Sequence, residues 1–567
     1  MKSFFGNLTS ALGRRSLLLV IAVLLPIFGI NHAALAAERV YASYSVLERS
    51  ISVSDLENYA RKGVISEDLA VYTQYLQPEQ LTELRQVLLS PIKVNAVAVS
   101  QFLYTPQGEF FLRRLAQVIR TQSGKEEPGF LALRSGLILA SSEPEGLTLL
   151  NLLRKYPSPN INIDISRTLG IAAELGKLVN ETDKAIIAVS QQSEAEASNL
   201  QKTVNLARMP DLKRKGRFPW KQYSLKQLDT VRGRFIATDV YLPSVQAPAP
   251  VIVISHGIGT DSSNFTYLAS HLASHGFVVV VPNHPGSDTK QLSSLLGGRT
   301  SEVAEAKEFI ERPLDVKYIL DHLERLNQSD PLYKGRMNMQ QVGVFGQSFG
   351  GYTALALAGA KLNFEELQQD CNQQALKDTW NVSLLLQCRV LDLAGTKYAQ
   401  QYDLRDERVK SVIAVNPITS SIFGEESLSQ VSIPVMIVAS SDDTVAPAVY
   451  EQILPFSWIG SSEKYLVMLK GGTHFSVIGN GKTSERQLAL PSEVIGDDPA
   501  QARRYMQSLT LPFFESYTAG TSKYLPYLNA AYAQKISSQP IRLSLIQTLN
   551  ITDLAQVLGD NFRKFKR

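Results

Sequence analysis

A serine flanked by glycines, between an apolar run and a small-residue run, is the feature that most constrains this chain. Gly346-Gln347-Ser348-Phe349-Gly350 follows Val342–Phe345 and precedes Gly351–Ala358. The pattern predicts a buried strand, a sharp turn and a helix. The two glycines let the strand and the helix approach each other without clashes between Cβ atoms. The turn should therefore hold the Ser348 hydroxyl at the N-terminus of a helix, where an anion is stabilised.

This strand, turn and helix resemble the nucleophile elbow of the α/β-hydrolases, in which a serine, an acid and a histidine follow one another along the chain. A serine hydroxyl needs a base to become a nucleophile, and the base needs an acid to orient it. His474 is the one histidine that follows Ser348, and it comes just after the apolar run Tyr465–Leu469. The order along the chain therefore predicts His474 as the base.

The candidates for the acid follow another apolar run, Val435–Val438. Asp442 and Asp443 both stand there, and Asp443 precedes Pro447 by four residues. In the α/β-hydrolases the acid commonly begins such a D-x-x-x-P run, so the resemblance favours Asp443 over Asp442. An aspartate pair can also belong to a surface turn. As the acid, Asp443 would fix the tautomer of the imidazole and stabilise the imidazolium.

An H-G-x-G turn supplies the candidate for the oxyanion site. His256-Gly257-Ile258-Gly259 follows the apolar run Val251–Ile254. By resemblance, the backbone N–H of Ile258 and that of Phe349, the residue after the nucleophile, would bind the oxyanion. We expect His256 to hold the loop rather than to act as a base. The other histidines before Ser348 lack the spacing of metal ligands, and we expect neither a metal nor an organic cofactor.

Short β-branched runs recur across the second half of the chain, and helical segments separate them. They lie at 251–254, 277–281, 342–345, 412–415, 435–438 and 465–469. Continuous apolar strands of this kind indicate a mainly parallel sheet with helices on both faces, an α/β fold. We expect this domain to span 218–567, with a helical insert at about 361–408 and a helical extension at about 483–567.

The first half of the chain has a different pattern. Residues 38–179 carry helical apolar stripes with frequent stops, which predict a small all-α domain, and they contain no histidine or cysteine. This region resembles a domain of unknown function found upstream of hydrolases in some bacterial proteins. Residues 180–217 are polar and poor in aromatic side chains, which favours a linker.

The N-terminus has the pattern of an export signal. Arg14 and Arg15 precede the apolar stretch Leu17–Ile30, and Ala34-Leu35-Ala36 offers a cleavage site. The stretch is short for a membrane span, so we predict a cleaved signal peptide over 1–36 and a periplasmic or secreted protein. An ordinary secretion signal and a twin-arginine signal both fit.

The charge balance sets limits on partners. The formal net charge is +4, and the first 36 residues contribute three of the basic side chains and no acid. The remainder is nearly neutral, which argues against nucleic acid as a partner and gives no charge-based support for an anionic membrane. A basic run at 213–217 leaves a peripheral membrane contact open.

Two cysteines, Cys371 and Cys388, both fall within the expected insert. In an exported protein such a pair suggests one disulfide, and two buried free thiols are the alternative. Neither cysteine stands beside a histidine motif, so we do not expect a cysteine nucleophile.

Further motifs resemble the platelet-activating-factor acetylhydrolases and the bacterial polyester hydrolases. They include Asn283-His284-Pro285-Gly286-Ser287 and Arg312-Pro313-Leu314-Asp315-Val316, beside the H-G-x-G turn and the elbow. Acetylhydrolases of the animal type carry the acid where this chain has Asn416-Pro417. The run that begins at Asp443 instead resembles the placement in polyester hydrolases. The resemblance implies a serine esterase acting on lipid or short-chain esters, with lipid catabolism as its process.

Two other functions remain open at this stage. The same three side chains could act on a peptide, a thioester or a polyester, because a fold does not fix its substrate. A binding protein built on an inactive hydrolase scaffold is the alternative from another class. Inactive relatives usually lose a member of the triad or a glycine of the elbow, and this chain keeps them all.

Overall fold

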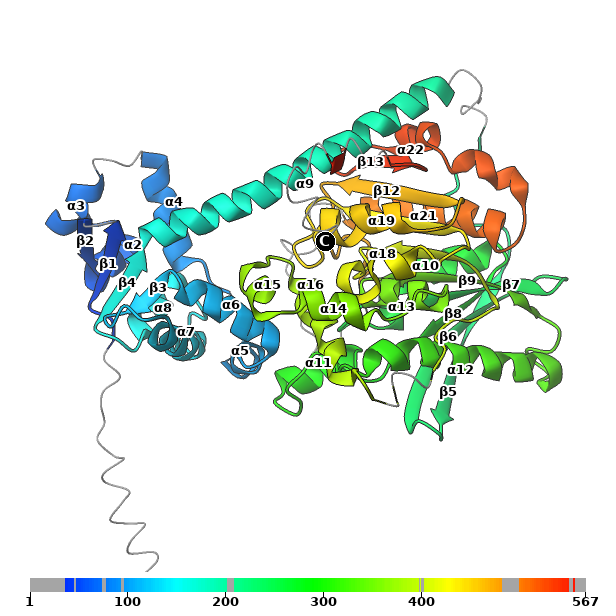
Figure 1. Cartoon of the computed structure of the whole chain (residues 1–567), viewed down its shortest axis with the longest axis horizontal. Helices are drawn as coiled ribbons and strands as arrows, with labels where there is room; N and C mark the ends of the chain where they lie inside the picture. The colour runs from blue at the N-terminus through cyan, green and yellow to red at the C-terminus, as the bar shows by residue number, and fades with distance from the viewer. Residues whose placement is uncertain are drawn as a thin grey trace, which may run out of the picture. The chain divides into compact units, whose positions relative to one another are not determined.

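The computed structural model describes residues 36–44, 47–73, 78–92, 96–200, 209–396, 398, 402–481, 499–549 and 554–555. The predicted signal peptide therefore lies outside the described residues, except for Ala36. The chain divides into two compact units, one formed by 1–104 and 108–171 and the other by 105–107 and 172–567 (Figure 1).

The first unit combines helices with a four-stranded sheet in the order β2-β1-β4-β3. Its strands are β1 (Arg39–Tyr44), β2 (Leu47–Ser52), β3 (Ile119–Thr121) and β4 (Asn160–Asp164). Its helices are α2 (Val53–Lys62), α3 (Glu67–Thr73), α4 (Pro78–Leu89), α5 (Ala96–Leu103), α6 (Pro106–Ala116), α7 (Glu126–Ser141) and α8 (Leu149–Lys155). The expectation of an all-α domain is wrong, because strands of three to six residues carry too little alternation to stand out beside strong helical stripes.

Helix α9 (Ile165–Leu200) corrects a second expectation, the linker at 180–217. From residue 172 onward the helix belongs to the second unit. There Ala185, Ile186 and Val189 are buried in the same core cluster as strands of the large sheet. The polar composition of the segment reflects the exposed side of a long helix, and a narrow apolar stripe on the other side anchors it.

The second unit is built on a nine-stranded sheet in the order β13-β12-β11-β10-β9-β7-β8-β6-β5. Neighbours from β8 to β12 pair in parallel, and the outer strands β6, β5 and β13 join antiparallel. The strands are β5 (Trp220–Asp229), β6 (Arg234–Pro243), β7 (Ala249–Ser255), β8 (Val278–Pro282), β9 (Met337–Gln347), β10 (Val409–Val415), β11 (Val435–Ser440), β12 (Lys464–Lys470) and β13 (Arg542–Ile546).

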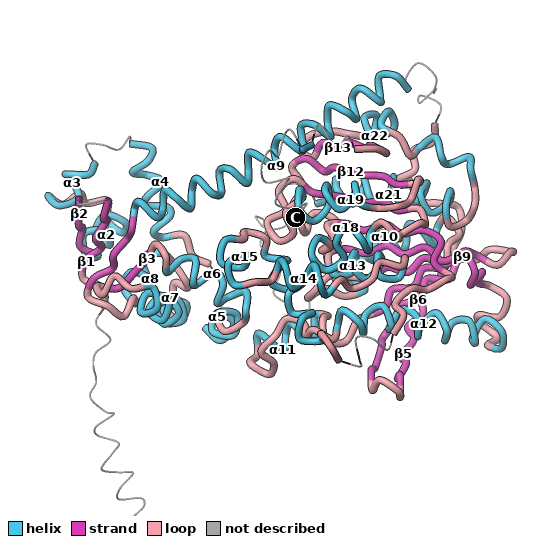
Figure 2. Tube along the Cα trace, viewed as in Figure 1, coloured by secondary structure: helices cyan, strands magenta, loops and turns pink. Residues whose placement is uncertain are grey.

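Helices cover both faces of this sheet (Figure 2). They are α10 (Thr266–Ser274), α11 (Thr289–Leu296), α12 (Glu308–Ser329), α13 (Phe349–Leu357), α14 (Phe364–Asp370), α15 (Gln373–Asp378), α16 (Val382–Gln387), α18 (Ser420–Leu428), α19 (Leu454–Trp458), α21 (Pro499–Tyr517) and α22 (Ala530–Ile536). Short helical turns of other types are η2 (Ser262–Phe265), η3 (Cys388–Leu393), η4 (Val449–Ile453) and η5 (Ser522–Tyr527). The predicted mainly parallel sheet with helices on both faces is confirmed.

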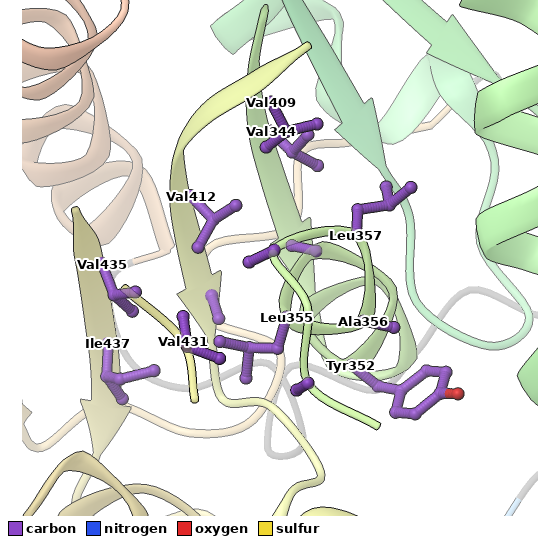
Figure 3. Close-up of a cluster of buried hydrophobic side chains, with 14 of the residues drawn as sticks. Val344, Tyr352, Leu355, Ala356, Leu357, Val409, Val412, Val431, Val435 and Ile437 are labelled. Carbon is purple, nitrogen blue, oxygen red and sulfur yellow. The ribbon is translucent and has the colours of Figure 1, made fainter. Parts of the chain in front are cut away.

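The central strands contribute side chains to two separate hydrophobic cores, because successive side chains of a strand point to opposite faces of the sheet. On β11, Val435 and Ile437 belong to the buried cluster that includes residues of α13 and α18, whereas Met436 and Val438 belong to the cluster that includes residues of α10 and α21. Figure 3 shows the first of these cores, where Leu355 of α13 lies among valines of β9, β10 and β11. Strands buried on both faces are the physical reason for the continuous apolar runs in the sequence.

The sequence led us to expect a helical C-terminal extension. The described part of this extension also contains a strand. Its helices α21 and α22 cover one face of the sheet. The chain then adds β13, which pairs antiparallel with β12. None of the helices in the described part of the chain has both the length and the apolar character that crossing a membrane requires.

In its described residues, the insert between α13 and β10 contains the short helices α14, α15, α16 and η3. Cys371 at the end of α14 and Cys388 at the start of η3 form a disulfide. The buried carboxylate of Glu451 accepts hydrogen bonds from Asn381 Nδ2 and Gln387 Nε2 of the insert, at 2.5 and 2.9 Å.

The same carboxylate also accepts from the backbone N–H groups of Thr419 and Ser420, at 2.7 and 3.0 Å. These residues follow strand β10. With this many donors, the hydrogen-bonding capacity of the buried carboxylate is satisfied. Glu451 thus ties the insert to the carboxyl edge of the sheet.

Candidate active site

The turn at Ser348 has a strained backbone, and the glycines on either side of it are in close contact with neighbouring backbone atoms. Ser348 stands between β9 and α13 with φ 56° and ψ −118°, a conformation that a side-chain-bearing residue rarely adopts. A Cβ atom at Gly346 would lie 1.9 Å from the Gly350 carbonyl oxygen, and one at Gly350 would lie 2.0 Å from the Ser255 carbonyl oxygen. Both positions therefore exclude any side chain, and the strained backbone is held by close packing of strand, turn and helix.

We expect Gly350→Ala to lower the free energy of unfolding of the second unit by at least about 3 kcal/mol, because the new methyl group would overlap the backbone at the end of β7. Gly176→Ala is the matched control, since it also lies in a helix but has no atom within 4 Å of the added methyl group. That change should stabilise by up to about 1 kcal/mol. All three tryptophans, Trp220, Trp380 and Trp458, lie in the second unit, so urea unfolding followed by tryptophan fluorescence measures both effects. Equal stability of the two variants would contradict this account of the elbow.

The three side chains expected from the sequence meet at the carboxyl edge of the sheet. His474 Nε2 lies 2.9 Å from Ser348 Oγ, and His474 Nδ1 lies 2.7 Å from Asp443 Oδ2. His474 and Asp443 are buried, with 3% and 6% of their surfaces exposed. Both distances are those of hydrogen bonds, so the groups form a continuous line from hydroxyl to carboxylate.

The structure distinguishes the two aspartates after β11. Asp443 turns inward, and its Oδ1 accepts from the N–H groups of Val445 and Ala446, at 2.9 and 2.7 Å. Those bonds leave Oδ2 directed at the imidazole. Asp442 is exposed and its Oδ1 accepts from the neighbouring Ser441 hydroxyl, whereas the carboxylate that bonds His474 is that of Asp443.

Two amide side chains hold the histidine loop, and the sequence analysis did not identify them. Gln347 Nε2 and Asn416 Nδ2 both donate to the His474 carbonyl oxygen, at 3.1 and 3.2 Å. Asn416 has a positive φ of 43° and stands directly after β10. The position of Asn416 directly after a central strand could have marked it as a candidate from the sequence, because polar residues at such strand ends face the site. Here the residue supports the base and does not contact the imidazole nitrogens.

The H-G-x-G turn lies directly against the elbow. A Cβ atom at Gly257 would lie 3.3 Å from Ser348 Cβ and 2.3 Å from Gln347 Oε1. The Gly257 carbonyl accepts from His256 Nδ1 and Thr260 Oγ1, at 2.7 and 3.0 Å. His256 is thus a loop-holding residue, as its place in the sequence suggested.

The backbone N–H groups of Ile258 and Phe349 flank this junction of turn and elbow. Phe349 is the first residue of α13, where a helix leaves its N–H groups without intrahelical partners. Within the described residues neither N–H donates a hydrogen bond to the protein. Their role as donors to an oxyanion stays a prediction.

Burial keeps the loop histidine neutral. Burial, with the positive charge of Arg312, holds the pKa of His256 well below its usual value. Its Nε2 accepts from the N–H of His284 at 3.0 Å, so Nδ1 carries the proton that it donates to Gly257. Among the described residues no group of three or more His, Cys, Asp or Glu side chains is arranged to hold a metal ion.

The second unit contains a cavity of about 640 Å³. Its walls come from α9, the insert and the segments after β10 and β11, and include Trp380, Pro447, Tyr450 and Trp458. Pro447 belongs to the D-x-x-x-P run that begins at Asp443. The residues that line the cavity do not include Ser348, Asp443, His474, Ile258 or Phe349.

Two family models match this chain. Residues 209–371 match chlorophyllase, an esterase-like hydrolase, over a span that contains the H-G-x-G turn and the elbow. Residues 36–164 match an alpha/beta hydrolase of unknown function (DUF1400). The chain has an α/β-hydrolase fold. The matches and the fold indicate an esterase-like hydrolase, and no curated protein matches the chain.

The two matches divide between the two units. The DUF1400 match falls on the first unit, which contains none of the five predicted site residues. The chlorophyllase match ends before Asp443 and His474. Neither of these matches is to the acetylhydrolases or the polyester hydrolases that the motifs resemble.

Proposed function

We propose that this protein is a serine carboxylic-ester hydrolase that acts through an acyl-enzyme. The observation that carries the proposal is the hydrogen-bonded line from Ser348 Oγ through His474 to Asp443, placed on a strained elbow. Nucleophile, base and orienting acid are within contact distance in the arrangement that serine hydrolysis needs.

The reaction follows from these contacts. His474 Nε2 takes the hydroxyl proton as Ser348 Oγ attacks the ester carbonyl, while Asp443 holds the Nδ1 proton and stabilises the imidazolium. The Ile258 and Phe349 N–H groups bind the carbonyl oxygen as it becomes negative. His474 then returns the proton to the leaving alcohol, and the acyl group remains on Ser348. Water, activated by the same imidazole, attacks the acyl-enzyme and releases the acid.

The proposed substrates are lipid esters or short-chain esters. The motifs shared with acetylhydrolases and the chlorophyllase match both support an ester. The motif resemblance favours acetylated phospholipids within this class.

A substrate panel tests the proposal. Purified protein is assayed with p-nitrophenyl acetate, butyrate and palmitate, with chlorophyll because of the family match, and with a peptide. We expect turnover of at least one ester and none of the peptide. Cleavage of the peptide without ester turnover would reject the proposed function, and no labelling by a fluorophosphonate under any condition would favour an inactive scaffold.

We also propose that the protein is exported. The disulfide between Cys371 and Cys388 supports this, because such bonds persist in oxidising compartments. The expected outcome is a periplasmic or secreted protein that has lost the residues before about 37. Mass spectrometry of the protein from its native cells measures the N-terminus, and an intact leader on a cytoplasmic protein would contradict export.

A further inference from the structure

Arg312 in α12 is a buried cation that the proposed mechanism does not use. Its side chain is wholly buried. Its guanidinium donates to Ser287 Oγ at 2.8 Å, to Ser255 Oγ at 3.2 Å, to Thr353 Oγ1 at 3.3 Å and to the His256 carbonyl. A buried charge with this many partners is held in one place.

This guanidinium contacts both segments that carry the proposed oxyanion donors. On one side it binds the carbonyl of His256, two residues before Ile258. On the other side its central carbon lies 4.7 Å from the centre of the Phe349 ring, within the range of a cation–π contact. Through Thr353 it also reaches the Phe349 carbonyl, which accepts from Thr353 Oγ1 at 2.9 Å.

We propose that Arg312 is the positioning residue of the oxyanion hole, because it fixes the Ile258 and Phe349 N–H groups relative to each other. The inference rests on the proposed ester hydrolysis. Arg312 acts through the two backbone segments and does not contact substrate.

The geometry of the turn carries the effect of Arg312 to the Ile258 N–H. Arg312 holds the His256 carbonyl, and His256 Nδ1 holds the next carbonyl, that of Gly257. In a planar trans peptide the C=O and the N–H point in opposite directions. Fixing the Gly257 carbonyl therefore fixes the direction of the Ile258 N–H.

A network of buried charges keeps the support of Arg312 rigid. Asp315, one turn further along α12, accepts from Arg232, Arg234 and His284, at 2.9, 2.8 and 3.1 Å. Arg234 also binds Glu308 at 2.7 Å. Every one of these charges is paired inside the protein, so movement of one would leave another unpaired and buried.

The network contains a second group of serine, histidine and aspartate side chains in contact with one another. Their burial indicates a structural role for this group. His284 Nε2 lies 3.0 Å from Ser255 Oγ, and its Nδ1 faces Asp315. All three side chains are completely buried, and Ser255 Oγ also accepts from Arg312. No substrate can reach this serine, so the array orients Arg312 and the start of the turn.

Arg312→Lys tests the inference, because lysine keeps the charge and loses the fork of donors. The readout is the ratio of kcat/KM for an oxoester to that for its thionoester, in which sulfur replaces the carbonyl oxygen. Sulfur is larger and a weaker acceptor, so a well-formed oxyanion hole favours the oxoester. We expect oxoester kcat/KM to fall by about 10- to 100-fold, mostly in kcat, and the ratio to fall with it.

Arg408→Lys is the matched control. Arg408 is also largely buried and paired with Asp406 and Asp321, at the opposite end of the sheet before β10. It should lose stability while keeping the oxoester preference. If Arg312 had only a general structural role, Arg312→Lys would behave like Arg408→Lys. Both variants would then have a lower melting temperature and an unchanged ratio of oxoester to thionoester kcat/KM.

Two further outcomes complete the test. Should Arg312→Lys fail to fold, Thr353→Val removes one anchor of the guanidinium at nearly constant volume, and it should lower the ratio by about 3- to 10-fold. An unchanged ratio in the folded variant overturns the inference and leaves the proposed function intact. Absence of ester turnover in the unmodified protein overturns both.

Discussion

Ser348→Ala should abolish ester hydrolysis, with kcat reduced by about a million-fold, because alanine removes the nucleophile from an otherwise intact site. Among the residues that the structure describes, Ser348 Oγ makes one hydrogen bond, with His474 Nε2. Its loss should change the melting temperature by no more than about 2–3 °C. The measurement combines hydrolysis of the preferred p-nitrophenyl ester with thermal unfolding, so that lost activity is separated from lost structure.

Fluorophosphonate labelling gives the same variant a second readout. The unmodified protein should be labelled at Ser348, identified by peptide mapping, and Ser348→Ala should not be labelled. Ser329→Ala is the control, since its hydroxyl lies exposed near the end of α12 and bonds the Arg325 carbonyl. It should retain full labelling and activity. Label in Ser348→Ala, at any other serine, would show that the nucleophile has been assigned to the wrong residue.

Asp443→Asn should lower kcat by about ten-thousand-fold. Oδ1 of Asp443 is already held by two backbone N–H groups, so the asparagine oxygen would occupy that place. The amide nitrogen would then face His474 Nδ1 and donate to it. The imidazole would carry its proton on Nε2, where it cannot accept the proton of Ser348. The fold should persist, because the change is isosteric.

The comparison with Asp442→Asn decides the assignment of the acid. Asp442 is exposed and its carboxylate accepts from Ser441, so its variant should keep nearly full activity. A greater loss in Asp442→Asn than in Asp443→Asn would show that the acid is wrongly assigned. Both variants are measured by kcat and by the rate of fluorophosphonate labelling.

A double variant tests whether the acid can move to the position used by acetylhydrolases of the animal type. Asn416→Asp combined with Asp443→Asn should not recover activity. The Asn416 side chain donates to the carbonyl oxygens of Thr473 and His474, at 3.3 and 3.2 Å. A carboxylate there would face two carbonyl oxygens and would repel them. Recovery would mean that the histidine loop can rearrange.

The sequence predicted the α/β core well because its signals are local. Runs such as Val435–Val438 are apolar on both faces, and only a strand covered on both sides needs that composition. The candidate triad was equally constrained, because one histidine follows Ser348 and one aspartate has the spacing to Pro447. In both cases a few residues are enough to favour one interpretation over the others.

The features that the sequence missed depend on partners far along the chain. Strand β1 pairs in parallel with β4, where Arg39 lies opposite Asn160, and nothing in either segment indicates the other. Similarly, Asn416 and Gln347 support the histidine only because the fold brings three strand ends together. Polar side chains at such positions can be recognised as candidates, but their partners follow from the three-dimensional arrangement.

Helix α9 has a practical consequence for anyone who shortens this chain. Residue 209, where the chlorophyllase match begins, invites a truncation that would keep all five proposed site residues. Such a fragment would lack Ala185, Ile186 and Val189 and would present the apolar surface beneath them to water. Exposed patches of this kind promote aggregation. A fragment meant for crystallisation or assay should therefore start no later than residue 172.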